Sequence, residues 1–148
     1  MLNSLQMALC DTQGQLFELA AERGYASETF IKAYTTSAVA TDMDKEFHHI
    51  QWAGKAYILS RMEDELADQL IKGGEIYDKE ALYWMGYSYR YWHFYTGESS
   101  REIYKQAPAK TMNVVYIMYH TMSPEMAIDR LRESYSIDDK TAGEMHND

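Results

Sequence analysis

Residues 79–96 read KEALYWMGYSYRYWHFYT and contain eight aromatic residues within thirteen positions. Asp78 before this stretch and Gly97 after it are typical of helix ends, because a short acidic side chain accepts from the first backbone amides and glycine adopts the left-handed conformation of a carboxyl-terminal cap. On a helical wheel the side chains form two broad faces, one with Trp84, Tyr91, Trp92 and Tyr95, and one with Tyr83, Tyr87, Arg90 and Phe94. A helix that is apolar on every side is normally central, so the stretch predicts a central aromatic helix.

The rest of the chain also favours helices, because its apolar residues recur at helical spacing and strand signals are scarce. The predicted helices cover residues 4–23, 27–41, 51–72 and 100–106, a segment that begins near Pro108, and a last segment after the Ser123–Pro124 cap. Residues 42–49 are predicted as a loop, and the tail after Asp138 as frayed. Six or seven helices of unequal length predict one irregular all-α domain over residues 1–148, since a regular four-helix bundle needs longer and more equal elements.

Three local signals refine this prediction. Ser27 is expected to cap the second helix, and Ser99 and Glu102 have the spacing of a reciprocal capping box. Gly86 in the middle of the aromatic helix lowers helix stability unless the missing side chain serves a purpose. Its two interpretations are the close approach of another helix and room for a ligand or partner.

The composition of the chain limits the kinds of molecule that it is expected to bind and the compartment in which it is expected to work. The chain has 23 acidic and 14 basic residues and a formal net charge of −9, which disfavours nucleic acids and anionic membranes and permits a basic protein partner. No apolar run approaches the roughly 20 residues that span a bilayer, and the amino terminus has no basic leader. A single cysteine, Cys10, excludes an internal disulfide framework and suits a reducing compartment. We therefore expect a cytoplasmic protein.

The aromatic helix has three interpretations. It is either a core helix whose tyrosine hydroxyls reach polar neighbours, or a partly exposed aromatic patch that binds protein, since Tyr, Trp and Arg dominate interface hot spots. The residues predicted to bind a partner are Tyr83, Tyr87, Tyr89, Arg90 and Phe94. The third interpretation is a small-molecule pocket against this helix, with Arg90 and His93 among its polar groups.

Signals for chemistry are weak. A cluster of Asp42, Asp44, Glu46, His48 and His49 has residue types that bind divalent metals, but its spacing matches no known ligand pattern. We therefore predict neither a metal nor a cofactor. His93 and His120 are expected to be buried histidines that each make one hydrogen bond, and Cys10 beside Asp11 is not expected to be a nucleophile. No nucleotide, dinucleotide or hydrolase motif is present, and no catalytic residue is predicted.

One resemblance adds to these observations. The segments FIKAYTTSAVA (30–40) and YWMGYSYRYWHFYTGESSREIYKQAP (83–108) resemble a group of small uncharacterised bacterial proteins with a YW-x-G-x4-YW-x2-YTG-x-S core and an I-x4-P segment. The matching positions are Tyr83, Trp84, Gly86, Tyr91, Trp92, Tyr95, Thr96, Gly97, Ser99, Ile103 and Pro108. Members of this group are often encoded in mobile clusters beside proteins that resemble ADP-ribosyltransferase toxins. The resemblance implies an antitoxin or accessory role and transfers no catalytic residue.

The expected function is therefore a non-enzymatic protein-binding module, of the antitoxin, immunity or phage and mobile-element inhibitor kind, that neutralises a partner protein. The alternative is a small-ligand-binding protein or enzyme with a pocket against the aromatic helix. Self-association is compatible with either, because surface aromatic residues are often buried between copies.

Overall fold

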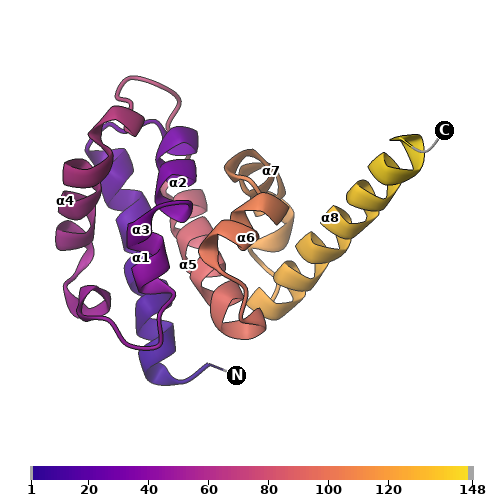
Figure 1. The fold of residues 1–148 in the computed structure, drawn as a ribbon, viewed down its shortest axis with the longest axis horizontal. Coiled ribbons are helices and arrows are strands. Elements are labelled where there is room, and N and C mark those ends of the chain that lie inside the picture. The colour runs from indigo at the N-terminus through magenta and orange to yellow at the C-terminus, as the bar shows by residue number, and fades with distance from the viewer. Residues whose placement is uncertain (1, 147–148) are drawn as a thin grey trace.

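The computed structural model of the protein describes the backbone of residues 2–146 and the side chains of residues 2–140 (Figure 1). Over this range the chain is helical and has no strand, only an isolated bridge between Tyr25 and Lys72. The elements in order are α1 (Ser4–Glu22), α2 (Ser27–Thr35), α3 (Ala38–Met43), η1 (His49–Trp52), α4 (Lys55–Leu66), η2 (Ala67–Gln69), α5 (Lys79–Thr96), α6 (Ser100–Gln106), α7 (Ala109–Tyr119) and α8 (Pro124–His146). The all-α prediction is confirmed, with eight α-helices among the described residues in place of six or seven.

The aromatic helix α5 has the predicted bounds and lies at the centre of the fold, against α1. Gly97 adopts a φ of +80° and ends the helix, while Asp78 occupies the cap position without a capping hydrogen bond from its side chain. A Cβ atom built on Gly86 would lie 2.4 Å from the carbonyl oxygen of Gln13 and 2.8 Å from the Cα atom of Gly14. The two backbones therefore touch, and close approach of another helix is the correct interpretation of Gly86.

The core is rich in aromatic rings that meet edge to face. Phe17 of α1 lies 6.0 Å from Phe30, 5.7 Å from Tyr34 and 6.3 Å from Tyr89, measured between ring centroids. Such pairs stabilise a core by about 0.5–1.5 kcal/mol each beyond the area they bury. Trp92 of α5 is also fully buried, so the core-helix interpretation of α5 is largely correct.

Two predicted helices are broken in the structure. The segment 27–41 divides at Ser37, whose hydroxyl accepts from the amide of Ala40 and caps α3. Ser27 is not a cap, because its hydroxyl accepts instead from the amide of Tyr77. The segment 51–72 divides at Gly54, which has a φ of +91°. Of this segment only α4 is a regular α-helix. The apolar periodicity runs on across Gly54, but the backbone conformation of this glycine is incompatible with a continuous helix.

The capping box is also placed differently. Ser99 accepts from the amide of Glu102 at 3.2 Å, which is only half of the predicted reciprocal pair. A complete capping box forms at Asn3 and Gln6 instead. Ser123 accepts from the amide of Met126 at 3.2 Å, so the predicted start of the last helix is confirmed.

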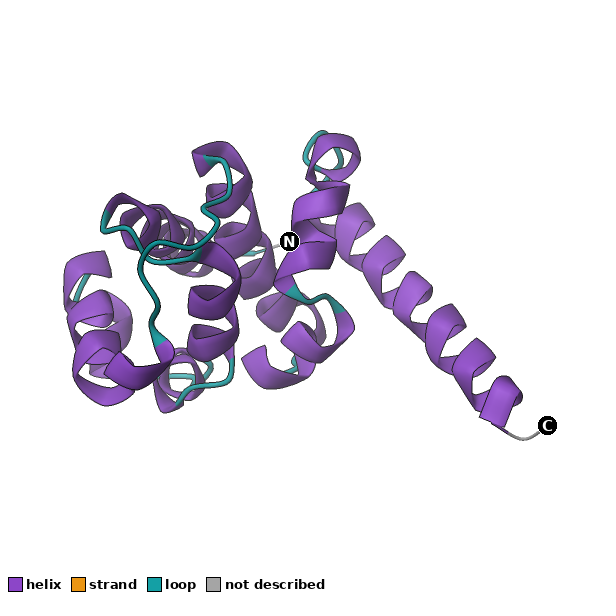
Figure 2. Cartoon of the chain, turned by 90° about the horizontal axis from the view of Figure 1, so that it is seen from above, coloured by secondary structure: helices purple, strands orange, loops and turns teal. Residues whose placement is uncertain are grey.

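The last helix leaves the body of the molecule. Ala127, Ile128 and Leu131 are buried, and beyond Leu131 the helix projects away from the other elements (Figures 1 and 2). In the structure α8 continues to His146, through a sequence with several helix formers and no proline. The fraying expected after Asp138 stays a prediction. Within the described range, no helix has both the length and the apolar character needed to cross a membrane.

Candidate functional site

The five residues predicted to bind a partner do not share an exposed face. Tyr89 and Arg90 are 3% and 0% exposed, whereas Tyr83, Tyr87 and Phe94 are half-buried. The Tyr89 hydroxyl points into the protein and donates to the Ala107 carbonyl at 2.5 Å. The expectation of one solvent-facing surface is therefore wrong for Tyr89 and Arg90, because α6 and the residues after α3 cover that side of α5.

Arg90 is the centre of a buried polar network. Its guanidinium donates to Oδ1 of Asp44 at 2.6 Å and to Oε1 of Gln13 at 2.9 and 3.1 Å. Gln13 in turn accepts from the Tyr34 hydroxyl at 2.7 Å and donates to the Gly86 carbonyl at 2.8 Å. A buried charge needs such pairing, because an uncompensated one is strongly unfavourable. The network joins α1, α2 and α5 to Asp44 and is structural.

A hollow of about 480 Å³ lies beside the carboxyl end of α5. The first turns of α1, residues 44–52 and the end of α5 form its walls. Three large apolar side chains on this hollow are exposed: Phe47 is 83% exposed, Leu5 64% and Trp52 57%. Half-buried Phe94 adds a fourth. We call these four residues, Leu5, Phe47, Trp52 and Phe94, the apolar rim.

Two polar side chains in the hollow, Asp44 and His93, already have hydrogen-bond partners. Oδ1 of Asp44 accepts from Arg90 and from the Ser100 hydroxyl at 2.7 Å, and Oδ2 accepts from the Ser100 amide at 2.8 Å. Nδ1 of His93 lies 2.7 Å from the Glu98 carbonyl oxygen and 3.8 Å from Oδ1 of Asp44, so the ring proton at Nδ1 goes to the carbonyl. His93 thus makes the single hydrogen bond predicted for it. Asp44 and His93 therefore do not form an acid–base pair aligned for catalysis.

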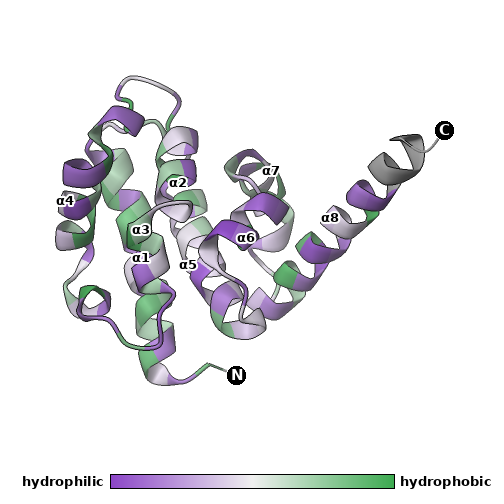
Figure 3. Cartoon of the chain, viewed as in Figure 1, coloured by the Kyte–Doolittle hydropathy of each residue, from purple (hydrophilic) through white to green (hydrophobic). Residues whose placement is uncertain are grey.

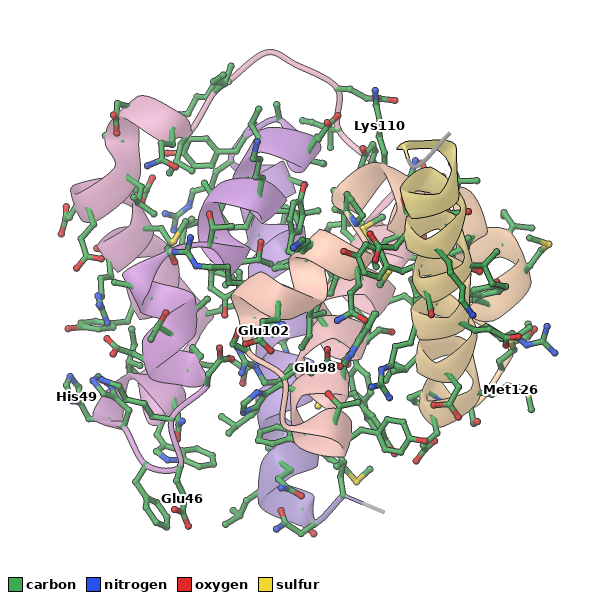
Figure 4. The ribbon with its side chains drawn as sticks, turned by 45° about the vertical axis from the view of Figure 1, so that its right-hand side comes forward. Glu46, His49, Glu98, Glu102, Lys110 and Met126 are labelled. Carbon is green, nitrogen blue, oxygen red and sulfur yellow. The ribbon has the colours of Figure 1, made fainter. Side chains whose placement is uncertain are left out.

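Exposed Glu46 lies at the edge of the same hollow. Figure 4 shows it at the lower end of the molecule, on the turn that follows α3. The hollow consequently offers apolar contact in its walls and a carboxylate at its margin.

Tyr83 and Tyr87 line a second, smaller hollow of about 270 Å³ between α5 and the turn that joins α7 to α8. The Tyr83 hydroxyl donates to Oδ1 of Asp11 at 2.5 Å, and burial together with this bond raises the pKa of Tyr83. Burial also raises the pKa of Tyr87. Both phenols are therefore neutral near pH 7. His120, on the same hollow, is exposed, which corrects the prediction that it is buried.

Asp42 and His48 of the acidic and histidine-rich segment have partners within the protein. The Asp42 carboxylate pairs with Lys45 at 2.8 Å and with Arg61 at 2.7 Å, and these partners lower its pKa, the Lys45 hydrogen bond most. Nδ1 of His48 accepts from the Ile50 amide at 3.1 Å. Across the described residues, no three His, Cys, Asp or Glu side chains are placed to hold a metal ion together. Cys10 is fully buried, and burial raises the pKa of its thiol to about 12, so it is not a thiolate.

Sequence reasoning missed the apolar rim. Phe47 lies in the segment 42–49 that is predicted as a loop, and Trp52 falls inside the helix predicted over 51–72. Gly54 inside that helix was the available signal, because glycine is unfavourable in a helix interior by about 1 kcal/mol relative to alanine. A break there places Trp52 on the loop side with Phe47.

A scan against profiles of known protein families, a search of curated proteins and a search of solved structures each found no match. The relationship to the bacterial group with the YWxG core therefore stays a prediction.

Proposed function

We propose that the protein is a non-enzymatic binding module that neutralises a partner protein, and that the apolar rim is its binding surface. The observation that carries this proposal is the exposure of Phe47 and Trp52 beside a hollow that their own side chains do not fill. Large exposed apolar side chains gathered at one place mark interaction sites, whereas single ones are ordinary. Trp in particular is enriched among residues that dominate binding energy.

The charge of the chain favours a basic partner. With a net charge of −9, the protein attracts positively charged proteins over about a Debye length, and exposed Glu46 provides a carboxylate at the edge of the site. The apolar rim would supply most of the binding affinity. The acidic surface would raise the rate of association and favour basic partners over others.

An antitoxin, immunity or phage and mobile-element inhibitor role is the form of this function that we propose, acting in the bacterial cytoplasm. Its supports are the resemblance of residues 83–108 to proteins encoded beside toxin-like neighbours, and a lone, buried, free thiol at Cys10 that suits a reducing compartment. Each neighbouring gene product is therefore a candidate partner that can be tested directly.

The test is to express the full chain with each product of the genes that flank its own, and to measure the affinity of any complex by titration calorimetry. Trp52→Ala and Phe47→Ala should each weaken binding by about 30-fold, the effect of removing a hot-spot residue. Ile76→Ala is the matched control, because Ile76 is also exposed but lies on the loop between η2 and α5. Figure 1 shows that loop at the top of the view and the segment 44–52 at the bottom. Unchanged affinity in both rim variants would refute the proposed surface.

A small apolar ligand is the second candidate occupant, because about 480 Å³ lies within the volume range of small-molecule sites. A thermal-shift screen with aromatic and heterocyclic compounds would reveal it, since a ligand that binds only the folded state raises the melting temperature. A rise that disappears in Trp52→Ala would place the ligand in this hollow. A flat screen would remove this candidate.

A further inference from the structure

Residues 111–122, TMNVVYIMYHTM, contain no Asp, Glu, Lys or Arg, in a chain in which a quarter of the residues are charged. Most of this stretch forms α7, and it lies on the other side of α5 from residues 44–52 (Figure 1). It is therefore separate from the apolar rim. A solvated helix surface normally carries charged residues, so the absence of charge calls for an explanation.

Three large apolar residues of α7 face solvent. Val114, Ile117 and Met118 have helical spacing that places them on one side, and they are 74%, 73% and 61% exposed. Only Ala109 and Met112 of this helix are buried. Figure 3 shows green, hydrophobic residues on α7 next to the more hydrophilic α6. We call Val114, Ile117 and Met118 the α7 face.

We propose that the α7 face is the surface on which two copies of this chain associate. A two-fold symmetric interface places the same patch of each copy against itself. Two copies with a charge of −9 each repel one another, and acidic groups inside a symmetric interface would oppose acidic groups. The uncharged α7 face lets two copies meet without placing acidic groups opposite one another in the contact, so that only the longer-range repulsion between the two acidic chains opposes association.

A basic partner is the wrong occupant for this surface. The α7 face has no carboxylate to attract such a partner, and the nearest charge at its amino-terminal end is the exposed cation Lys110. Figure 4 shows Lys110 at the upper end of the part of the molecule formed by α7 and α8, and Met126 at its lower right. Met126 is also exposed and follows the short turn after α7.

The contact is small. A standard interface involves about 20–30 residues on each side, and the α7 face with Met126 supplies only a few apolar anchors. We therefore expect a dimer with a dissociation constant in the micromolar range or weaker, which forms at high protein concentration.

The test is sedimentation velocity of the full chain from about 1 to 500 μM, at low and high sodium chloride. The expected result is a monomer–dimer equilibrium that shifts toward dimer as salt rises, because salt screens the repulsion between the two acidic copies. A complex with a basic partner at the apolar rim has the opposite salt dependence. The proposal for the α7 face and the proposal for the apolar rim can therefore be refuted independently of one another.

Ile117→Glu is the decisive variant, because it places two like charges near the two-fold axis at a site too exposed to affect folding. It should raise the dissociation constant at least tenfold and leave the circular dichroism spectrum and melting temperature unchanged. Ile71→Glu adds the same charge at another exposed position and serves as the control. A monomer at every concentration and salt, a dimer that persists in Ile117→Glu, or equal loss in Ile71→Glu would overturn the proposal. A chain that stays monomeric and binds neutral lipid vesicles through Ile117 would overturn it as well.

Discussion

Gly86→Ala tests the contact on which the fold depends. The added Cβ would lie 2.4 Å from the Gln13 carbonyl oxygen and 2.8 Å from the Cα atom of Gly14. Both neighbours are backbone atoms and cannot move by changing a rotamer, so α1 and α5 must separate by several tenths of an ångström or more. Overpacking of this kind destabilises by roughly 1–3 kcal/mol, and we expect the upper part of that range.

The gain in helix propensity from glycine to alanine offsets about 1 kcal/mol of this loss. The net expectation is a free energy of unfolding lowered by about 2 kcal/mol, which corresponds to a melting temperature lower by about 4–8 °C in a domain of this size. The separation would also disturb Gln13, which donates to the Gly86 carbonyl at 2.8 Å and accepts from Arg90.

The assay is urea denaturation followed by circular dichroism, with Ser60→Ala as a control on an exposed position of α4. The control should change stability by less than about 0.5 kcal/mol. A Gly86→Ala variant as stable as the wild type, or more stable, would show that α1 and α5 are not in backbone contact at this position and would refute the packing described above.

Two further predictions concern the carboxylates near α3. Asp44→Ala leaves the buried Arg90 guanidinium without its counter-charge and should lower the free energy of unfolding by about 3–5 kcal/mol in urea denaturation, whereas exposed Glu46→Ala should leave it nearly unchanged; equal effects would contradict the network. The pKa of Asp42 is lower in the folded state, chiefly through Lys45, so its contribution to stability is present above about pH 4 and is lost as the pH falls through the folded-state pKa. Asp42→Asn should remove that part of the pH dependence of the melting temperature, and an unchanged profile would count against the pairing.

The bounds of α5 could be predicted because the signals that set them are local. Gly97 ends the helix through its own backbone conformation, and the aromatic run contains no residue that would break it. Gly86 likewise indicated that its missing side chain makes room for something, either another helix or a ligand or partner. These features depend on residues near one another in the chain, where sequence reasoning is strongest.

The burial of Tyr89 and Arg90 could not be predicted in the same way. A helix that is aromatic on every side carries no signal for which side faces solvent, and the answer depends on Ala107, which accepts from Tyr89, and on Asp44, 46 residues before Arg90. Asp44 itself looked like one of several acids in a polar turn. Only its position in space shows that it is the counter-charge of the central helix.

The most direct test of the central claim is hydrogen–deuterium exchange of the full chain, free and in complex with the partner protein. If the apolar rim is the binding surface, amides in residues 2–9 and 44–54 should exchange more slowly in the complex, while those of α7 should be unchanged. Protection confined to α7, or to the segment around Tyr83 and Tyr87, with none in residues 44–54, would contradict the account.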